Sequence, residues 1–174
     1  MVTKKEIAGL GDVKRNKLLC AVDVSDNAET PEYVVIGYKV SSSNVEFNPN
    51  VEKTADILGA NYSDVTKLEI SQTFEPHRLT TGEHGKLAAK LITILRNNEL
   101  EKLSQFKCIL IYGFLTEGAP YEADLYKSCT ISVTSLGGES YVDMPITIDF
   151  GGEVEHGTVD KAIGEVKFTA VPEA

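Results

Sequence analysis

The histidines are the first residues in this chain whose chemistry needs explaining. His77, His84 and His156 do not form the HExxH or HxH spacing that is typical of metal sites. Each stands in or beside a polar loop or a helix start, so we interpret all three as surface histidines. The sequence therefore predicts no metal site and no cofactor.

Two groups of carboxylates could bind calcium or hydrolyse glycosides, because paired acids serve both chemistries. They are Glu117, Glu122 and Asp124 near one turn, and Glu153 and Glu155 near another. No aromatic platform accompanies them, and the chain has no Trp. Solvated acidic loops are therefore the favoured interpretation. A hydrolase that uses His156 with Glu153 or Glu155 stays open as a minor alternative.

Motifs for nucleophilic catalysis and phosphate binding are missing from the sequence. There is no GxSxG elbow, and no Lys-Ser/Thr pair follows Gly82 and Gly85, so a P-loop is excluded. Cys20, Cys108 and Cys129 lie inside apolar or alternating runs, which predicts reduced core or strand residues. We therefore expect a protein that is not an enzyme.

Composition places the chain among ordinary globular proteins. It has 174 residues, 42% of them hydrophobic and 25% charged, with a net charge of −9. The net negative charge argues against a nucleic-acid-binding protein, because phosphate binding needs clustered Lys and Arg. No apolar run has the length to cross a membrane, and the N-terminus has no signal-peptide core. We expect folding in a cytoplasm and no membrane partner.

The chain divides into an N-terminal arm over residues 1–16 and a single β-sandwich domain over residues 17–174. Alternating or β-branched runs predict the strands. The runs cover residues 17–24, 33–40, 44–47, 65–75, 106–115, 126–135, 141–150 and 164–171. Residues 153–162 are expected to be a polar connection.

One helix is expected over about residues 83–97. Leu87, Leu91, Ile94 and Leu95 recur at helical spacing, and Thr80 and Glu83 have the spacing of a capping box. The sequence therefore predicts a mainly β fold. It would be an antiparallel β-sandwich or split barrel of about seven or eight strands with one flanking α-helix.

Two segments have one polar face, as expected for strands that cover a core. In residues 65–75 the apolar face holds Leu68, Ile70 and Phe74. The opposite face holds Lys67, Glu69, Ser71, Thr73 and Glu75. Residues 126–135 and 141–150 form the best hairpin candidate, joined by a turn containing GGE. The polar face of its second strand holds Asp143, Thr147 and Asp149.

An ordered set of motifs resembles one known family. Asp56-Ile57-x-Gly59, Asp64-Val65 and then SQTFEP over residues 71–76 are similar to a segment of phage tail tube (major tail) proteins. That family includes proteins of siphophages, myophages and related prophage particles. Residues 121–159 are similar to the family's closing hairpin. The resemblance covers about residues 15–172, and its motifs are specific as a set rather than singly.

The resemblance implies a structural subunit of a virion tail, assembled in the cytoplasm of a bacterial host. Hexameric rings would stack into a hollow tube through which genomic DNA passes without specific binding. The implied partners are further copies of the chain, the tape measure, the tail terminator, and baseplate or distal tail proteins. Acidic side chains in such a channel would repel phosphates and let DNA slide.

The resemblance also implies roles for particular residues. The candidate lumen or subunit-interface face comprises Lys67, Glu69, Ser71, Thr73, Glu75, Asp143, Thr147 and Asp149. The candidate contacts between rings comprise Lys4, Lys5, Asp56, Ile57, Leu58 and Gly59.

Two alternatives to a phage tail tube stay open. The first is the tube subunit of a phage-tail-like contractile injection particle, which would have the same fold and a different cargo. The second, from another class, is a ligand- or carbohydrate-binding β-sandwich such as an adhesin, with calcium at the acidic turns.

Overall fold

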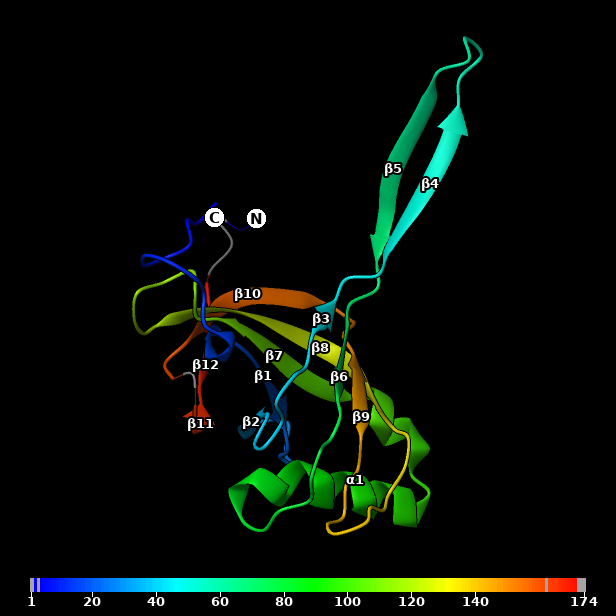
Figure 1. Cartoon of the computed structure of the whole chain (residues 1–174). Coiled ribbons are helices and arrows are strands. Elements are labelled where there is room, and N and C mark those ends of the chain that lie inside the picture. Colours follow the sequence, from blue (N-terminus) through cyan, green and yellow to red (C-terminus); the bar gives the residue numbers. More distant parts are fainter. Residues whose placement is uncertain (1, 3, 162, 172–174) are drawn as a thin grey trace.

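The computed structural model describes residue 2, residues 4–161 and residues 163–171 of the chain. Over these residues the fold is mainly β, with a curled antiparallel sheet forming a half-barrel and one α-helix (Figure 1). The helix, α1 (Lys86–Asn97), lies across one end of the half-barrel. This confirms the fold class predicted from the sequence.

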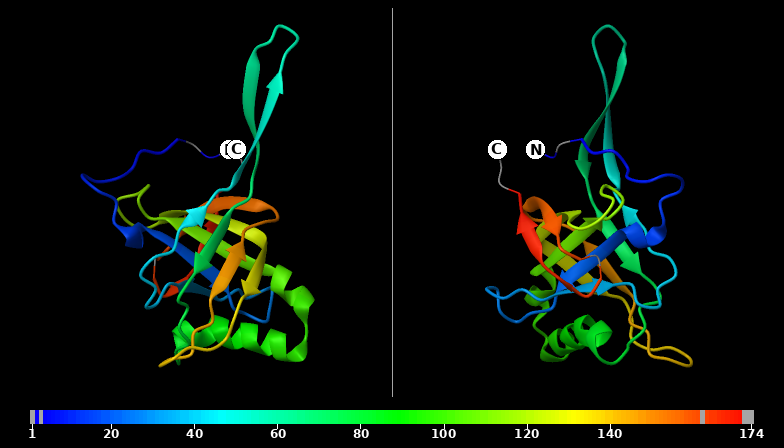
Figure 2. Two further views of the ribbon diagram at one scale, coloured as in Figure 1. Left: turned by 45° about the vertical axis from the view of Figure 1, so that its right-hand side comes forward. Right: turned by 90° about the vertical axis from the view of Figure 1, so that its left-hand side faces the viewer.

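The main sheet has the strand order β11-β2-β1-β7-β8-β9-β6-β3, and each described pairing is antiparallel. The strands on this path are β1 (Leu18–Asp23), β2 (Tyr33–Ile36), β3 (Val45–Glu46), β6 (Ser71–Phe74), β7 (Phe106–Tyr112), β8 (Tyr121–Val133), β9 (Ile146–Asp149) and β11 (Glu165–Val166). Strand β10 (Val154–Val159) pairs with the first half of β8 and with β12 (Phe168–Ala170). The sheet bends strongly along its length (Figure 2).

The curl of the sheet creates two apolar layers that share the central strands. One side of β7 places Cys108 and Leu110 in the cluster under α1, and the other places Ile109 and Ile111 in a second cluster. Val159 of β10 belongs to this second cluster, so the C-terminal strands cover the outer side of β7 and β8. Burying one such aliphatic side chain contributes about 1.5–3 kcal/mol.

Helix α1 buries most of the predicted apolar stripe: Leu87, Leu91 and Ile94 are each at most 4% exposed, whereas Leu95 is 39% exposed. It ends at Asn98, which adopts the left-handed conformation (φ 57°) of a C-cap. The predicted capping box is wrong: a 3₁₀ turn (Glu83–Gly85) precedes the helix, and no side chain caps its N-terminus. Gly85 is packed so closely that an added Cβ would lie 2.0 Å from the carbonyl oxygen of Thr80.

The predicted continuous strand over residues 65–75 is also wrong, because the structure divides it. Its first part belongs to a projecting hairpin of β4 (Pro49–Ala55) and β5 (Asn61–Leu68), and its second part is β6 of the main sheet. Leu68 is 50% exposed on the hairpin, whereas Phe74 is 2% exposed in the core. Alternation of apolar and polar residues is equally compatible with an exposed hairpin strand and with a strand that covers the core. It therefore could not locate the division between β5 and β6.

The predicted pairing of the two C-terminal segments is confirmed, but their predicted tight turn is wrong. Strand β8 pairs with β9 from Thr130–Asp149 to Val133–Ile146, yet the connection runs over residues 134–145 instead of a tight turn. Residues 153–162 were predicted as a polar connection, but they contain strand β10. The predicted last strand is divided into β11 and β12.

Candidate assembly surfaces

A polar face covers one side of the strands β3, β6, β9 and β8, where two separately predicted patterns meet. Strand β6 pairs with β9, which aligns Ser71 with Asp149 and Thr73 with Thr147. The full polar face consists of Glu46 on β3, Ser71 and Thr73 on β6, Thr147 and Asp149 on β9, and Thr130 and Ser132 on β8. The opposite side of the same strands is core, with Phe74, Ile131, Ile146 and Ile148.

Hydroxyl groups dominate this polar face. The Oγ1 atoms of Thr73 and Thr147 lie 3.0 Å apart across the two strands. The charged members are the two acids Glu46 and Asp149. The sequence analysis did not single out Glu46, Thr130 or Ser132. Their alternation was visible, but only the strand order places them beside Thr147.

Four of the predicted face residues lie elsewhere. Lys67 and Glu69 stand where the hairpin leaves the body and form an exposed ion pair of 2.8 Å. The hydrogen bond from Lys67 lowers the pKa of the Glu69 carboxyl below its usual value. Glu75 is exposed beyond the end of β6, and Asp143 is half-buried in the 134–145 connection. The eight predicted residues therefore occupy four places.

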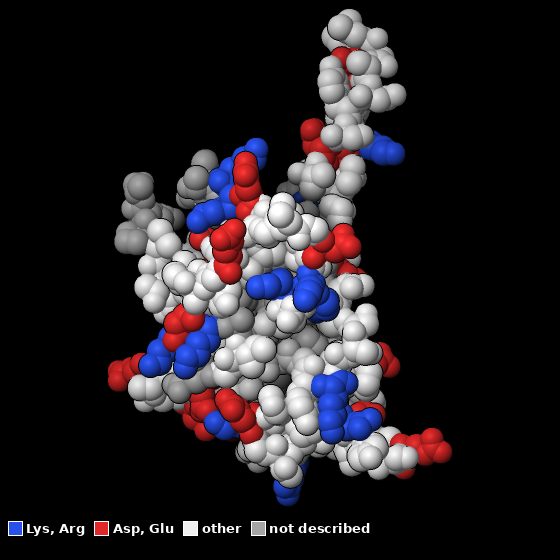
Figure 3. All heavy atoms as spheres, turned by 60° about the vertical axis from the view of Figure 1, so that its left-hand side comes forward, with Lys and Arg blue, Asp and Glu red and all other residues white. Residues whose placement is uncertain are grey.

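The hairpin of β4 and β5 projects away from the body, and each of its strand residues is exposed (Figures 1 and 3). Glu52 and Asp64 face each other across its strands. Like charges in such a pair repel each other, and an isolated two-stranded hairpin is marginally stable in water. At the junction with the body, Nδ2 of Asn48 donates hydrogen bonds to the Glu69 carbonyl (2.9 Å) and to Oγ of Ser71 (3.2 Å).

The tip of the hairpin contains the predicted Asp56–Gly59 segment. Oδ1 of Asp56 accepts hydrogen bonds from the amides of Leu58 (2.8 Å) and Ala60 (2.9 Å), and Oδ2 accepts one from the Tyr62 hydroxyl (2.9 Å). The amide of Ala60 and the Tyr62 hydroxyl are the main causes that lower the pKa of Asp56. This network presents Ile57 and Leu58 to solvent, 102% and 88% exposed.

The N-terminal arm makes polar contacts with the body, among them a hydrogen bond from Nη2 of Arg15 to the Ser43 carbonyl (2.7 Å). The amide of Ala8 donates to the Phe114 carbonyl (2.8 Å), and Nζ of Lys5 lies 2.8 Å from Oε1 of Glu122. Lys4 is exposed. The arm also exposes apolar side chains, with Ile7 62% and Leu10 104% exposed.

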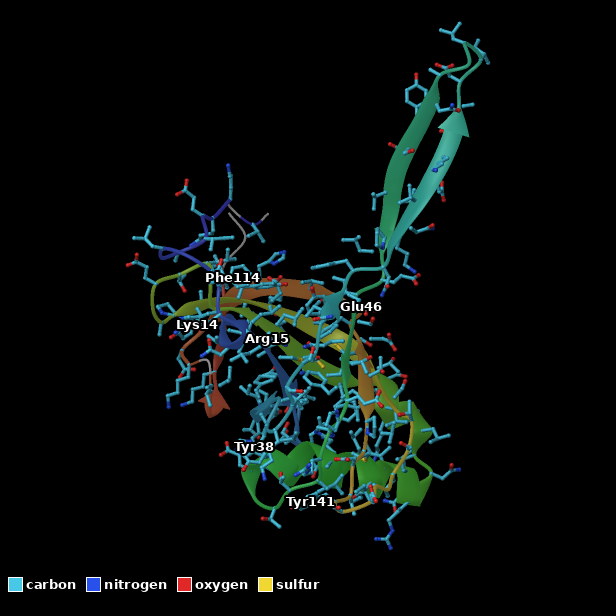
Figure 4. The ribbon with its side chains drawn as sticks, viewed as in Figure 1. Lys14, Arg15, Tyr38, Glu46, Phe114 and Tyr141 are labelled. Atoms are coloured by element: carbon cyan, nitrogen blue, oxygen red, sulfur yellow. The ribbon has the colours of Figure 1, made fainter. Side chains whose placement is uncertain are left out.

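An aromatic surface lies at the end of the molecule opposite the hairpin, beside α1 (Figure 4). We call it the Tyr141 surface, and it consists of Tyr38, Arg78, His84 and Tyr141. Tyr38 stacks on His84 with ring centroids 4.3 Å apart and planes inclined by 4°. The guanidinium carbon of Arg78 lies 4.0 Å from the centroid of the Tyr141 ring. No sequence signal connects residues 78 and 141, because the fold brings them together.

The groups considered for catalysis do not form a metal site in the described part of the chain. His156 places Nδ1 2.6 Å from Oδ1 of Asp124, whereas Glu153 and Glu155 pair with Lys127 at 3.3 Å. His77 is buried, which corrects its interpretation as a surface histidine. Its Nδ1 lies 3.1 Å from the carbonyl oxygen of Met144, and burial lowers its pKa. No helix among the described residues is long and apolar enough to span a bilayer.

The cysteines are free and buried, which confirms their prediction as reduced core residues. Cys20, Cys108 and Cys129 are at most 1% exposed. Burial raises the pKa values of Cys20 and Cys108. Thiols in such surroundings are inert.

Comparison with solved structures shows that contractile injection particles contain chains with this fold. A chain from the sheath–tube complex of an extracellular contractile injection system (PVC), in the extended state, has a TM-score of 0.51 and 12% identity. The match covers 85% of this chain and 93% of that chain. A chain from the PVC sheath/tube terminator has a TM-score of 0.51 and 12% identity, over 86% and 99% of the two chains.

A third match is the tube-terminating cap of the anti-feeding prophage, with a TM-score of 0.52 and 13% identity. It covers 88% of this chain and 95% of that chain. Likeness at this level of identity shows a shared fold. No protein-family model and no curated protein matches the chain by sequence.

Proposed function

We propose that this chain is a non-enzymatic structural subunit of a tail-like tube, which assembles as hexameric rings that stack into a hollow conduit. The hairpin of β4 and β5 carries the proposal. Its strands are exposed throughout and its tip presents Ile57 and Leu58 to solvent. Such a hairpin gains stability only when a partner covers it.

The polar face fits the inner wall of such a conduit. Its core side is apolar, so β6 and β9 close the body while Ser71, Thr73, Thr147 and Asp149 stay in water. Hydroxyls with a few acids offer phosphate groups no cationic partner, so a nucleic acid or an acidic cargo would slide past. Lys67 and Glu69 lie at the junction where the hairpin leaves the body.

The exposed arm and hairpin tip are the proposed contacts between rings. Lys4 and Lys5 belong to the arm, and Asp56–Gly59 to the tip. In this proposal the further partners are the tape measure, the terminator, and baseplate or distal tail proteins. The assembled protein resides in the tail of a virion or tail-like particle, after assembly in a bacterial cytoplasm.

Two versions of the tube differ in cargo. A phage tail tube conducts genomic DNA, as the sequence resemblance implies. The tube of a contractile injection particle is the second candidate, and the fold shared with chains of the PVC and anti-feeding prophage particles favours it. Nuclease and protease treatment of native particles, before and after opening, distinguishes an enclosed nucleic acid from an enclosed protein.

Electron microscopy of the purified full-length chain at high concentration tests the assembly itself. We expect six-fold rings and stacks of rings. A variant that joins Asn48 to Glu69 through two glycines lacks the hairpin. It keeps the hydrogen bond between the Glu69 amide and the Phe47 carbonyl (3.0 Å) at the junction. We expect this variant to fold and to lose stacking. A full-length chain that sediments as a monomer at millimolar concentration would refute the proposal.

A further inference from the structure

The Tyr141 surface has the composition of a protein-binding site. Tyr38 is 46% exposed and Tyr141 is 61% exposed, and Leu136 and Val142 beside Tyr141 are 58% and 48% exposed. Tyr38, Arg78 and His84 line one small cavity of about 10 Å³. Tyrosine and arginine are enriched among the residues that dominate binding energy at protein interfaces.

Polar groups buried beside the Tyr141 surface, at Arg78 and in the segments next to it, have incomplete hydrogen bonding. Among the described residues, three of the five buried side-chain atoms without a partner are Nε of Arg78, Oγ1 of Thr80 and Oδ1 of Asp143. Such an atom costs about 1–3 kcal/mol. The segments that carry them are joined by a hydrogen bond from the Leu79 amide to the Val142 carbonyl (2.9 Å). A partner that reorients Arg78 or Asp143 would therefore gain hydrogen bonds.

The hairpin tip complements this surface in charge and in apolar character. Its network holds Ile57 and Leu58 as a small convex apolar pair, which suits an aromatic acceptor. Asp56 supplies a negative charge at the tip, and Arg78 supplies a positive charge on the acceptor. The tip and the Tyr141 surface lie at opposite ends of the molecule, so one copy cannot join them (Figures 1 and 4).

We propose that the Tyr141 surface of one copy receives the hairpin tip of a second copy, with Ile57 and Leu58 packed against Tyr38 and Tyr141. This contact rests on the proposed tube function and names its acceptor surface. It joins two different surfaces, so each copy keeps one free tip and one free acceptor. A contact of this kind does not close and therefore continues along an axis.

Cysteine cross-linking in the full-length chain tests the contact. One preparation carries Ala60→Cys at the tip and a second carries Val142→Cys next to Tyr141, so that Leu58 and Tyr141 themselves are kept. The native thiols are buried and stay out of the reaction. Mild oxidation of the mixed preparations should give disulfide-linked dimers that neither preparation gives alone. Leu100→Cys in place of Val142→Cys is the matched control, because Leu100 is 53% exposed and lies outside the Tyr141 surface.

Two single variants give an independent readout. Tyr141→Ala and Arg78→Ala should keep the melting temperature of the parent chain within a few degrees and leave at least tenfold fewer stacked rings. Tubes that form normally without the 60–142 cross-link would overturn this inference and leave the tube function standing. A full-length chain that never associates would overturn both.

Discussion

The hydroxyl groups of Thr73 and Thr147 lie 3.0 Å apart, although 74 positions separate these residues in the sequence. The contact aligns β6 with β9 and joins two polar patterns into one face. Because Phe74 and Ile146 point to the other side of the same strands, a single pair of strands separates the core from a hydroxyl-rich surface. The first prediction concerns that surface.

A lysine on the polar face should make assembled tubes retain DNA. In Thr147→Lys, each ring would carry a set of cations facing the channel. For each DNA phosphate that these cations neutralise, the binding constant should fall about tenfold when the salt concentration rises tenfold. Tubes assembled with short duplex DNA should protect it from nuclease. Thr93→Lys, on the exposed side of α1, adds the same charge outside the channel. Equal nuclease sensitivity in the two variants would place the polar face outside the lumen.

Residues 65–75 are divided between the hairpin and the core, so shortening their side chains to Ala should change the free energy of unfolding by unequal amounts. Phe74→Ala should lower the free energy of unfolding by about 3–5 kcal/mol, because it leaves a cavity in the core. Leu68→Ala should change it by about 0.5 kcal/mol or less, since that side chain is half exposed on the hairpin. Urea denaturation of monomeric protein measures both values. Similar losses for the two variants would favour one continuous core strand.

Acid should loosen the hairpin tip before the body. The folded-state pKa of Asp56 is lowered from its usual 3.8. Its ionised form therefore stabilises the tip at neutral pH, and this contribution is lost as pH falls below about 3.8 through the folded-state value. Nuclear magnetic resonance of the Leu58 and Ala60 amides at pH 6 and pH 3 should show the change.

Substitution of Asp56 provides the corresponding test at constant pH. In Asp56→Ala the same two amides should lose their ordered signals at pH 6. Glu52→Ala, on the same hairpin but outside the tip network, should leave them unchanged. A tip that stays ordered in Asp56→Ala would show that backbone hydrogen bonds alone hold the turn.

Removal of the arm should separate folding from association. Deletion of residues 1–14 removes the hydrogen bond at Ala8 and the ion pair at Lys5, neither of which reaches the core. We expect a nearly unchanged melting temperature and weaker stacking by sedimentation. Lys5→Ala alone should change stability by about 1 kcal/mol or less, as for exposed ion pairs. Undiminished stacking by the truncated chain would show that the arm makes no contact between rings.

The spacing of apolar residues predicted those helices and strands in which buried and exposed positions alternate regularly. The stripe through Leu87, Leu91 and Ile94 identified α1, and alternation identified the faces of β6, β8 and β9. The polar face was predicted in two halves, around Thr73 and around Thr147. Their adjacency depends on β9 lying between β6 and β8, and no local signal specifies that order.

Other features depend on what covers a residue, which alternation does not encode. Leu68 and Phe74 fall on the same face of the alternating pattern, yet Leu68 lies on the hairpin and Phe74 lies in the core. Strand β10 was missed because Gly157 interrupts its pattern. There, an added Cβ would lie 2.3 Å from the carbonyl oxygen of Thr169, so the glycine permits close strand pairing. Arg78 and Tyr141 meet only in the folded chain.

The hairpin has a further consequence because its strands bury no side chain in the body. In the proposed tube, substitutions along it would alter how copies meet without altering how each copy folds. Folding and association would then depend on separate parts of one short sequence. Selection could adjust the growth and the length of the assembly while the thermal stability of its subunit stays constant.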